Sequence, residues 1–485
     1  MMVREGRASE AQIKLKKIRR AKLPRPLAWK AASLARRVNL DNLAVSILNP
    51  IVRPGRKHFL HATAQEKAEY AQCLTKIGAP EEALAILKGI REPLPDVWKF
   101  QAAALIAEWN YDKAIPLLAR YIECGEVEPY QIIVAKVNMA SALVYERQFG
   151  QASEILEHLL EETQNNQYTL LHGNSLELAA QSAIFQKQWS AAAEFLSRAE
   201  RVLFGTGTLD EFFVMKWRAI LTLSQDSENS KTLSRLHRVG KEARERGHWE
   251  TIRDCDRIEA LITHNKSLLT HVYFGTPHES FRKWLCVDSE PNATFMAEYL
   301  WTLHSGKEAS IFDLKTGRIE GSLRKHLEVG DTLHQLFIAL CRDFYRPCRL
   351  PALHYQLYPN EFYNPVTSPN RVYQVMNRMR KWIKVNRLPI EISEEWGHYW
   401  LTANRPFRIR ITDRSKLGKI EPLILDTLQS SFGNQPFSVS QASEALSVSI
   451  PTALRRLSQA VSQGSLVRVG KGPGTKYCVP AKMAA

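Results

Sequence analysis

The sequence predicts a mainly α-helical protein with small β-hairpins. We expect a module of α-helical repeats over residues 61–300, followed by two smaller units of helices and a hairpin at 305–405 and 417–480. Three observations predict this organisation: an Ala- and Leu-rich pattern of helical period recurs in the middle of the chain, turn residues separate alternating strands in the last third, and charge is concentrated at both ends. A chain of 485 residues with 45% hydrophobic residues can fill several cores.

The net charge is unevenly distributed along the chain. Residues 1–60 hold 15 Lys and Arg against 3 Asp and Glu, and residues 300–485 hold 26 against 14, so each end carries +12. Residues 61–299 hold 25 against 33, which gives −8. A basic end attracts a polyanion because each neutralised phosphate releases condensed counterions. Ordinary solvated surface charge explains the same numbers, so the residue patterns must decide.

The basic N-terminal segment, residues 1–60, contains a stretch at 14–37 that mixes Lys and Arg with Leu, Ile and Trp29. Pro24 and Pro26 interrupt any long helix there. The stretch suits an arm that contacts phosphates, a helix that docks on an acidic partner, a helix at a membrane surface or a disordered tail.

Targeting and redox signals point to the cytoplasm. The chain has no apolar run of 18 residues, so we expect no transmembrane helix, and its first 60 residues lack the apolar stretch of a secretory signal. A mitochondrial transit peptide is the alternative, and Glu5 and Glu10 count against it. Seven scattered cysteines without a C-x-x-C pair indicate neither a zinc site nor a disulfide framework.

A similar pattern recurs in segments that begin near residues 70, 103, 140 and 179. Each segment has a helix with small residues, a short turn with glycine or an aromatic residue, and an Ala-led second helix. One such pair cannot bury its apolar face alone, so the pairs must stack. The anchoring alanines follow one another by 31, 38 and 40 residues: Ala83, Ala114, Ala152 and Ala192.

This pattern resembles the tetratricopeptide repeat, whose period is about 34 residues. The resemblance implies stacked helix hairpins whose concave face binds peptides or partner proteins. An irregular helical bundle is the alternative interpretation. Further helices with weaker repeat character are expected over 205–290.

The pattern changes near residue 305. Residues 310–323 are expected to form a hairpin around Lys315-Thr316-Gly317, with a further strand at 324–329. Asp331 suits the N-cap of a following helix, and a short helix is expected at 351–358.

The segment 368–384 predicts an amphipathic helix with Ser368 as its N-cap and Pro369 in its first turn. Its apolar stripe comprises Val372, Val375, Met376, Met379 and Ile383. The other face is expected to carry donors suited to guanine and adenine edges in a major groove, namely Arg371, Gln374, Asn377, Arg378 and Lys381. A hairpin around Glu395-Trp396-Gly397 follows at 388–402.

Residues 305–405 resemble the OmpR/PhoB type of winged helix in the leading hairpin, the Arg349-Leu350 step, the Arg378-Met379-Arg380-Lys381 run and the closing Gly397-His398-Tyr399. The resemblance implies that the third helix reads the major groove and the wing touches the minor groove. Two features depart from that family. Glu394 and Glu395 place carboxylates on the wing, and helical repeats replace the usual receiver domain. A winged helix retained for protein contacts is the alternative.

Residues 417–480 predict a second unit. A helix is expected at 421–432, a capping box joins Ser438 to Gln441, and Ser449 opens a helix that ends at Gly464. Leu454, Leu457 and Val461 are expected inside, and the exposed face is expected to carry Thr452, Arg455 and Arg456.

A basic hairpin with a glycine-rich tip follows at 466–479, with the phosphate-contacting candidates Arg468, Lys471 and Lys476. The order of cap, turn, helix and wing resembles MarR-like winged helix-turn-helix regulators. A small basic domain without a nucleic-acid role is the alternative.

Together these patterns predict a bacterial-type transcriptional regulator that binds double-stranded DNA, with a repeat module for a protein or peptide partner or for homo-oligomer formation. A protein-interaction scaffold and an RNA-binding protein are the alternatives. The chain has no G-x-x-x-x-G-K-[ST] loop, no G-x-S-x-G elbow and no H-E-x-x-H motif, so we expect neither an enzyme nor a cofactor, and no membrane partner.

Overall fold

The computed structural model describes residues 8–18, 20–53, 61–289, 298–321, 326–359, 361–412, 420–446, 448–462, 465–470 and 472–480. Within these residues it contains twenty-two α-helices and three sheets of two to four strands, so the prediction of a mainly helical chain with small sheets is confirmed. The chain divides into two compact units. The first comprises residues 1–272, 278–291 and 362–366, and the second comprises 273–277, 292–361 and 367–485.

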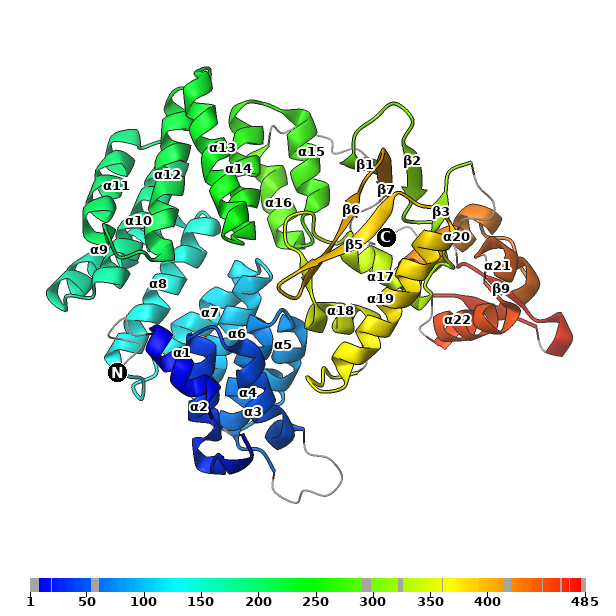
Figure 1. Cartoon of the computed structure of the whole chain (residues 1–485), viewed down its shortest axis with the longest axis horizontal. Helices are drawn as coiled ribbons and strands as arrows, with labels where there is room; N and C mark the ends of the chain where they lie inside the picture. The colour runs from blue at the N-terminus through cyan, green and yellow to red at the C-terminus, as the bar shows by residue number, and fades with distance from the viewer. Residues whose placement is uncertain are drawn as a thin grey trace. The chain divides into compact units, whose positions relative to one another are not determined.

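The first unit is built from helices that pack on their neighbours in sequence (Figure 1). The even-numbered helices also pack on one another from α2 to α6 and from α8 to α14, so each of these two runs forms a layer. The helices are α1 (Ala8–Lys16), α2 (Arg25–Arg37), α3 (Asp41–Val52), α4 (Ala64–Lys76), α5 (Pro80–Lys88), α6 (Pro95–Ala107), α7 (Tyr111–Ile122), α8 (Pro129–Tyr145), α9 (Phe149–Asn165), α10 (Thr169–Phe185), α11 (Trp189–Leu203), α12 (Leu209–Gln225), α13 (Ser230–Glu245), α14 (Trp249–Ile262) and α16 (Glu279–Asp288). Helix α15 (Lys266–Gly275) runs into the residues of the second unit.

Five hairpins of this unit, those whose second helix is anchored by an alanine, share one turn, which also occurs at Gln167 and Gly247. Each first helix ends with a residue in the left-handed region, and the next N–H bonds to the carbonyl five residues back, as in Ala79 to Leu74 and Gln148 to Leu143. This bond ends one helix and sets the direction of the next. The left-handed residues are Asn39, Gly78, Trp109, Arg147 and Lys187.

An alanine follows five residues after each of these left-handed positions. The four predicted anchors and Ala44 are all fully buried. A small side chain there lets the paired helices approach closely, because the distance between helix axes depends on the side chains at the contact. Ala44 belongs to the basic N-terminal segment, residues 1–60, which lies outside the predicted repeat module of residues 61–300. Helices α1–α3 share an apolar core with α4 and α5, so the described part of residues 1–60 belongs to the first unit.

The second unit begins with two small sheets around three helices. One sheet has the order β1-β7-β2-β3, and the other has the order β4-β6-β5. The apolar side chains of both sheets and of the three helices share one core. The elements are β1 (Glu298–His304), β2 (Ser310–Asp313), β3 (Arg318–Ile319), α17 (Thr332–Leu340), β4 (Cys348–Arg349), α18 (Leu350–Leu357), α19 (Ser368–Val385), β5 (Ile390–Glu395), β6 (His398–Ala403) and β7 (Phe407–Thr412).

The predicted hairpins at 310–323 and 388–402 are confirmed as β2–β3 and β5–β6. In the first, the Asp313 carboxylate accepts the N–H groups of Lys315 (2.8 Å) and Thr316 (3.1 Å). Gly317 has a φ of 69°, and a Cβ there would lie 2.3 Å from the carbonyl oxygen of Leu327, so only glycine fits. The further strand predicted at 324–329 lies partly outside the described residues.

The C-terminal part of the second unit has its own apolar core. It comprises α20 (Ile420–Phe432), α21 (Val439–Ala445), α22 (Ile450–Ser462), β8 (Val467–Val469) and β9 (Lys476–Cys478). The predicted capping box is confirmed, because Ser438 Oγ accepts the Gln441 N–H (3.2 Å) and Gln441 Oε1 accepts the Ser438 N–H (2.9 Å). Phe437 and Tyr477 exchange two backbone hydrogen bonds of 2.8 Å and tie this helix start to the hairpin.

Candidate nucleic-acid interface

Helix α19 separates its apolar and polar residues onto opposite faces. The five residues of the predicted apolar stripe are all buried in the core of the second unit. Gln374, Asn377, Arg378 and Lys381 are all exposed. Their spacing of three, four and seven residues places them together along one helix face. Two amides and two cations therefore form a continuous polar stripe, which we call the α19 stripe.

Two features of α19 were not among the predicted site residues. Lys384 is also exposed, three residues beyond Lys381, and extends the α19 stripe towards the end of the helix. The helical period that gave the other positions also indicates this one. Arg380 lies beside the stripe, donates to Asn377 Oδ1 (3.2 Å) and contacts the Ile392 carbonyl (3.5 Å), so it links the helix to the β5–β6 hairpin.

Arg371 is less available than predicted. Its guanidinium forms two hydrogen bonds with the Glu361 carboxylate and lies 3.9 Å from the ring centre of Tyr358. The hydrogen bond from Arg371 lowers the pKa of Glu361, so the carboxylate stays ionised and holds the cation. Among the described residues, the acidic neighbour of Arg378 is distant, with 4.0 Å between its Nη2 and Asp331 Oδ2. Of these two arginines, Arg378 is the better placed to donate to a ligand.

The β5–β6 hairpin has an acidic tip. Glu394 and Glu395 are exposed, and Trp396 between the strands is 90% exposed with a φ of 53°. The Gly397 N–H donates to the Glu394 carboxylate (2.8 Å). Carboxylates at this tip repel phosphates, and a bulky residue in the left-handed region is uncommon. The tip therefore suits a contact other than a nucleic-acid backbone.

Helix α22 is rotated from the expected orientation. Arg455 is exposed and Thr452 is partly exposed, but Arg456 is only 9% exposed and its guanidinium donates to the Val329 carbonyl. The prediction of Arg456 on the open face is therefore wrong. Leu454, expected inside, is 46% exposed.

The reason lies in the alanines of α22. Ala453, Leu457 and Ala460 are buried, and Arg456 lies on the same face. Leu457 is buried as predicted, but alanines rather than Leu454 complete the inward face. Burial lowers the pKa of Arg456. Arg456 thus connects α22 to the segment before α17.

The second hairpin presents part of the predicted basic set. Arg468 and Lys476 are exposed on β8 and β9, and Arg468 Nη2 lies 3.4 Å from Thr475 Oγ1. Lys471 lies outside the described residues, as does Gly464.

His334 is buried and holds two segments of the second unit together. Its Nδ1 accepts the Gly330 N–H (3.0 Å), and its Nε2 lies 2.9 Å from the Leu314 carbonyl. Burial lowers the pKa of His334 to about 4. The imidazole is therefore neutral near pH 7, and its contacts are structural.

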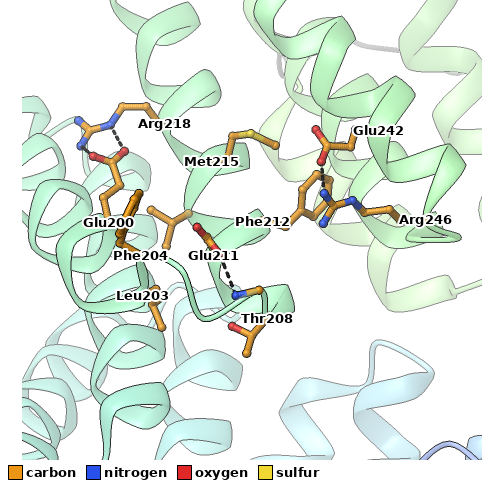
Figure 2. Close-up of a pocket in the computed structure, with 12 residues that line it drawn as sticks. Glu200, Leu203, Phe204, Thr208, Glu211, Phe212, Met215, Arg218, Glu242 and Arg246 are labelled. Carbon is orange, nitrogen blue, oxygen red and sulfur yellow. Dashed lines mark hydrogen bonds and ion pairs between the residues drawn. The ribbon is translucent and has the colours of Figure 1, made fainter. Parts of the chain in front are cut away.

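The first unit contains a cavity of about 530 Å³ among α11, α12 and α13 (Figure 2). Four charged groups in its wall form two pairs: Arg218 pairs with Glu200 at 2.9 Å, and Arg246 pairs with Glu242. The Glu211 carboxylate accepts the Gly207 N–H (3.1 Å). Phe204 and Met215 expose apolar surface beside these pairs. The cavity therefore combines apolar surface with ion pairs that are already satisfied.

A second cavity of about 450 Å³ lies among α2, α4, α6 and α8. Gln65 and Gln72 lie seven residues apart on α4, and Gln131 and Asn138 lie seven residues apart on α8, so each pair faces the same way. Gln72 is buried, and its Oε1 has no hydrogen-bond donor among the described residues. Amides can donate and accept at once, which suits the main chain of a peptide.

Within the described residues, no cluster of three His, Cys, Asp or Glu side chains is arranged to hold a metal ion. The helices of that part of the chain are also too short or too polar to cross a bilayer. No protein-family model and no curated protein sequence matches the chain.

Proposed function

We propose that this protein is a sequence-specific transcriptional regulator whose second unit binds double-stranded DNA through the α19 stripe and through α22 with the β8–β9 hairpin. The first unit would be a tetratricopeptide-like repeat module that binds a protein or peptide partner. In this proposal, residues 305–405 and 417–480 act as two winged helix-turn-helix domains.

The observation that carries the proposal is the α19 stripe. An α-helix fits the major groove of B-DNA, where an arginine can donate to guanine, and glutamine or asparagine can pair with adenine. Gln374, Asn377 and Arg378 supply these groups from one exposed face, while the opposite face fills the core. The helix is therefore held by its buried face and offers donors and acceptors along the α19 stripe.

Contacts with the phosphate backbone of the DNA would come from the remaining exposed cations. Lys381 and Lys384 on α19, and Arg468 and Lys476 on the second hairpin, are exposed. Such cations position a protein on DNA without reading its sequence. The acidic β5–β6 tip would stay away from phosphates. Residues 305–405 would therefore bind DNA through helix α19 alone.

The proposed partner-binding role of the first unit is supported by the cavity among α2, α4, α6 and α8. Its amides lie on α4 and α8, and the Oε1 of the buried Gln72 has no donor among the described residues. A buried acceptor without a donor is uncommon in folded proteins and indicates a place for a ligand or water.

Selection of bound sequences from a random duplex library, with the full chain as bait, tests the proposal. We expect one enriched motif and an affinity that falls steeply with salt. The Arg378→Ala chain should lose preference at one position of the motif, whereas Lys241→Ala in α13 removes the same charge at an exposed site of the first unit and should change nothing. No enrichment and no salt-dependent binding to any duplex would disprove the proposal.

An interaction scaffold is the second candidate. The acidic tip with the exposed Trp396 favours it, because a large exposed aromatic side chain is typical of protein contacts. Partners that remain bound after nuclease treatment and are lost with Trp396→Ala would favour the scaffold. Competition between duplex DNA and duplex RNA for the full chain distinguishes DNA binding from RNA binding.

A further inference from the structure

Helix α16 belongs to the first unit, although the chain on both sides of it belongs to the second unit. The chain enters the first unit for residues 278–291 and then leaves it again. Helix α16 places Phe281, Trp284, Leu285 and Asp288 at helical spacing on one face. Phe281 and Leu285 are buried, while Val287 on the outward face is 76% exposed.

Aromatic contacts hold the first half of this face. The ring centres of Phe281 and Trp109 lie 4.6 Å apart, and Trp109 stands at the turn between α6 and α7. The Trp284 ring lies 6.0 Å from Tyr145 at the end of α8 and 6.2 Å from Phe185 at the end of α10. Two anchors of α16 therefore contact three successive hairpins.

Ionic contacts hold the other half. The Asp288 carboxylate pairs with Arg147, at the turn between α8 and α9, and with Arg257 of α14 (3.5 Å). At the start of the helix, Ser280 Oγ donates to Asn110 Oδ1 (3.0 Å). Helix α16 thus lies across a groove formed by the hairpin turns and α14, which we call the α16 groove.

The fit of α16 in this groove is incomplete. Two donors of the groove itself, the Arg147 Nε and the Arg257 Nε, are buried, and neither has a hydrogen-bond acceptor among the described residues. A buried donor without an acceptor loses its hydration without compensation. A different helix could satisfy these donors better than α16 does.

We propose that the α16 groove is the receptor for an amphipathic helix of a partner protein, and that α16 is the internal helix which this partner replaces. The partner helix would carry an aromatic residue, a second aromatic residue three positions later and an acidic residue seven positions after the first. The aromatic residues would occupy the places of Phe281 and Trp284, and the acid would pair with Arg147 and Arg257. This inference rests on the proposed partner-binding role of the first unit and is independent of DNA binding.

Binding of a labelled peptide in trans tests the inference. The peptide comprises residues 278–289, and its anisotropy is measured with the full wild-type chain and with the full Phe281→Ala/Trp284→Ala/Asp288→Ala chain. We expect at least about 30-fold tighter binding to the triple variant, because the tethered α16 of the wild type competes at a high effective concentration. A Val287→Ala chain should behave as the wild type does, and a peptide with the three substitutions should bind neither chain.

A triple variant that keeps its helical circular dichroism but does not bind the peptide overturns the inference. If the variant does not fold, hydrogen exchange on the wild type decides. Excess isotopically labelled peptide should speed exchange of the α16 amides and leave those of α10 unchanged. Unchanged hydrogen exchange of the α16 amides at saturating peptide overturns the inference. A dimer in which two copies of the chain swap their α16 helices also overturns it. The duplex-binding measurement does not depend on this groove, so a failure here leaves the DNA-binding proposal intact.

Discussion

Two groups of cations, one in each unit of the molecule, are placed differently. In the first unit, Lys216, Arg253 and Arg257 are buried between helices, and Lys216 pairs with Asp254 at 3.0 Å. In the second unit, Arg378 and Lys381 lie on the exposed face of a helix whose other face fills the core. The comparison teaches that net charge alone says little about a polyanion partner. A cation buried between helices holds a fold together, and only one on an open, rigid face can meet a phosphate or a base.

The largest expected effect concerns a buried ion pair of the first unit. Asp254→Ala leaves Lys216 buried without its carboxylate and removes one of the two carboxylates beside Arg257, so the free energy of unfolding should fall by about 3–5 kcal/mol. Arg378→Ala, on the open face of the second unit, should change it by no more than about 0.5 kcal/mol. Denaturant unfolding of both full-length variants measures the contrast.

The control is the double replacement Lys216→Met/Asp254→Leu, which removes both charges and should recover most of the stability. A small loss for Asp254→Ala would mean that these charges are not buried as described, and the contrast between the units would disappear.

The pH dependence of the first unit gives the next effect. Burial raises the pKa of Glu177 to about 7, although Lys216 and the Gln181 amide (2.6 Å) favour its charged form. Between about pH 4.5 and 7 the unfolded chain releases this proton and the folded chain keeps it, so this group makes stability fall as pH rises. Glu177→Gln should remove that slope and be more stable than the wild type by roughly 3 kcal/mol at pH 8.

Thermal unfolding of both proteins at pH 4 and pH 8 checks this prediction. The two should coincide near pH 4, where the carboxyl is protonated in both states. A Gln variant that loses stability at pH 8 would show that the Glu177 charge is stabilising instead.

Within the second unit, adjacent arginines of α22 sharpen the same comparison. Arg456→Ala removes a charged hydrogen bond to the Val329 carbonyl and should lower stability by about 1.5–3 kcal/mol. Arg455→Ala removes an exposed cation and should leave stability unchanged while it weakens duplex binding. Unfolding and duplex titrations on both variants separate the two roles. Equal stability losses would contradict the buried position of Arg456.

The smallest effect concerns the start of α21. Ser438→Ala breaks the capping box with Gln441 and should cost about 1 kcal/mol. Ser458→Ala on the exposed face of α22 is the matched control and should be nearly neutral. Differential scanning calorimetry compares the two melting temperatures, and equal values would mean that the cap contributes little.

Much of the fold was predictable where the signal is local. The buried alanines of the hairpins, the Lys315-Thr316-Gly317 turn, the Ser438 cap and the apolar stripe of α19 all follow from the spacing of a few neighbouring residues. The same helical period gave the α19 stripe. These features depend on backbone geometry that each short segment carries by itself.

The remaining features depend on contacts between distant residues. Strand β7 lies beyond the expected boundary at 405 and pairs with β1 about 100 residues earlier. Arg456 is buried because Val329, far away in sequence, accepts its hydrogen bond. The inward face of α22 depends on alanines, whose small apolar side chain suits either face, so periodicity alone did not orient the helix.

Titration of the selected duplex with the full chain at several salt concentrations tests the central claim most directly. The wild-type affinity should fall steeply with salt, and the Gln374→Ala/Arg378→Ala/Lys381→Ala chain should lose about two orders of magnitude in affinity and show a flatter salt slope. Equal affinities and slopes for the two chains, with both folded, would contradict DNA recognition by α19.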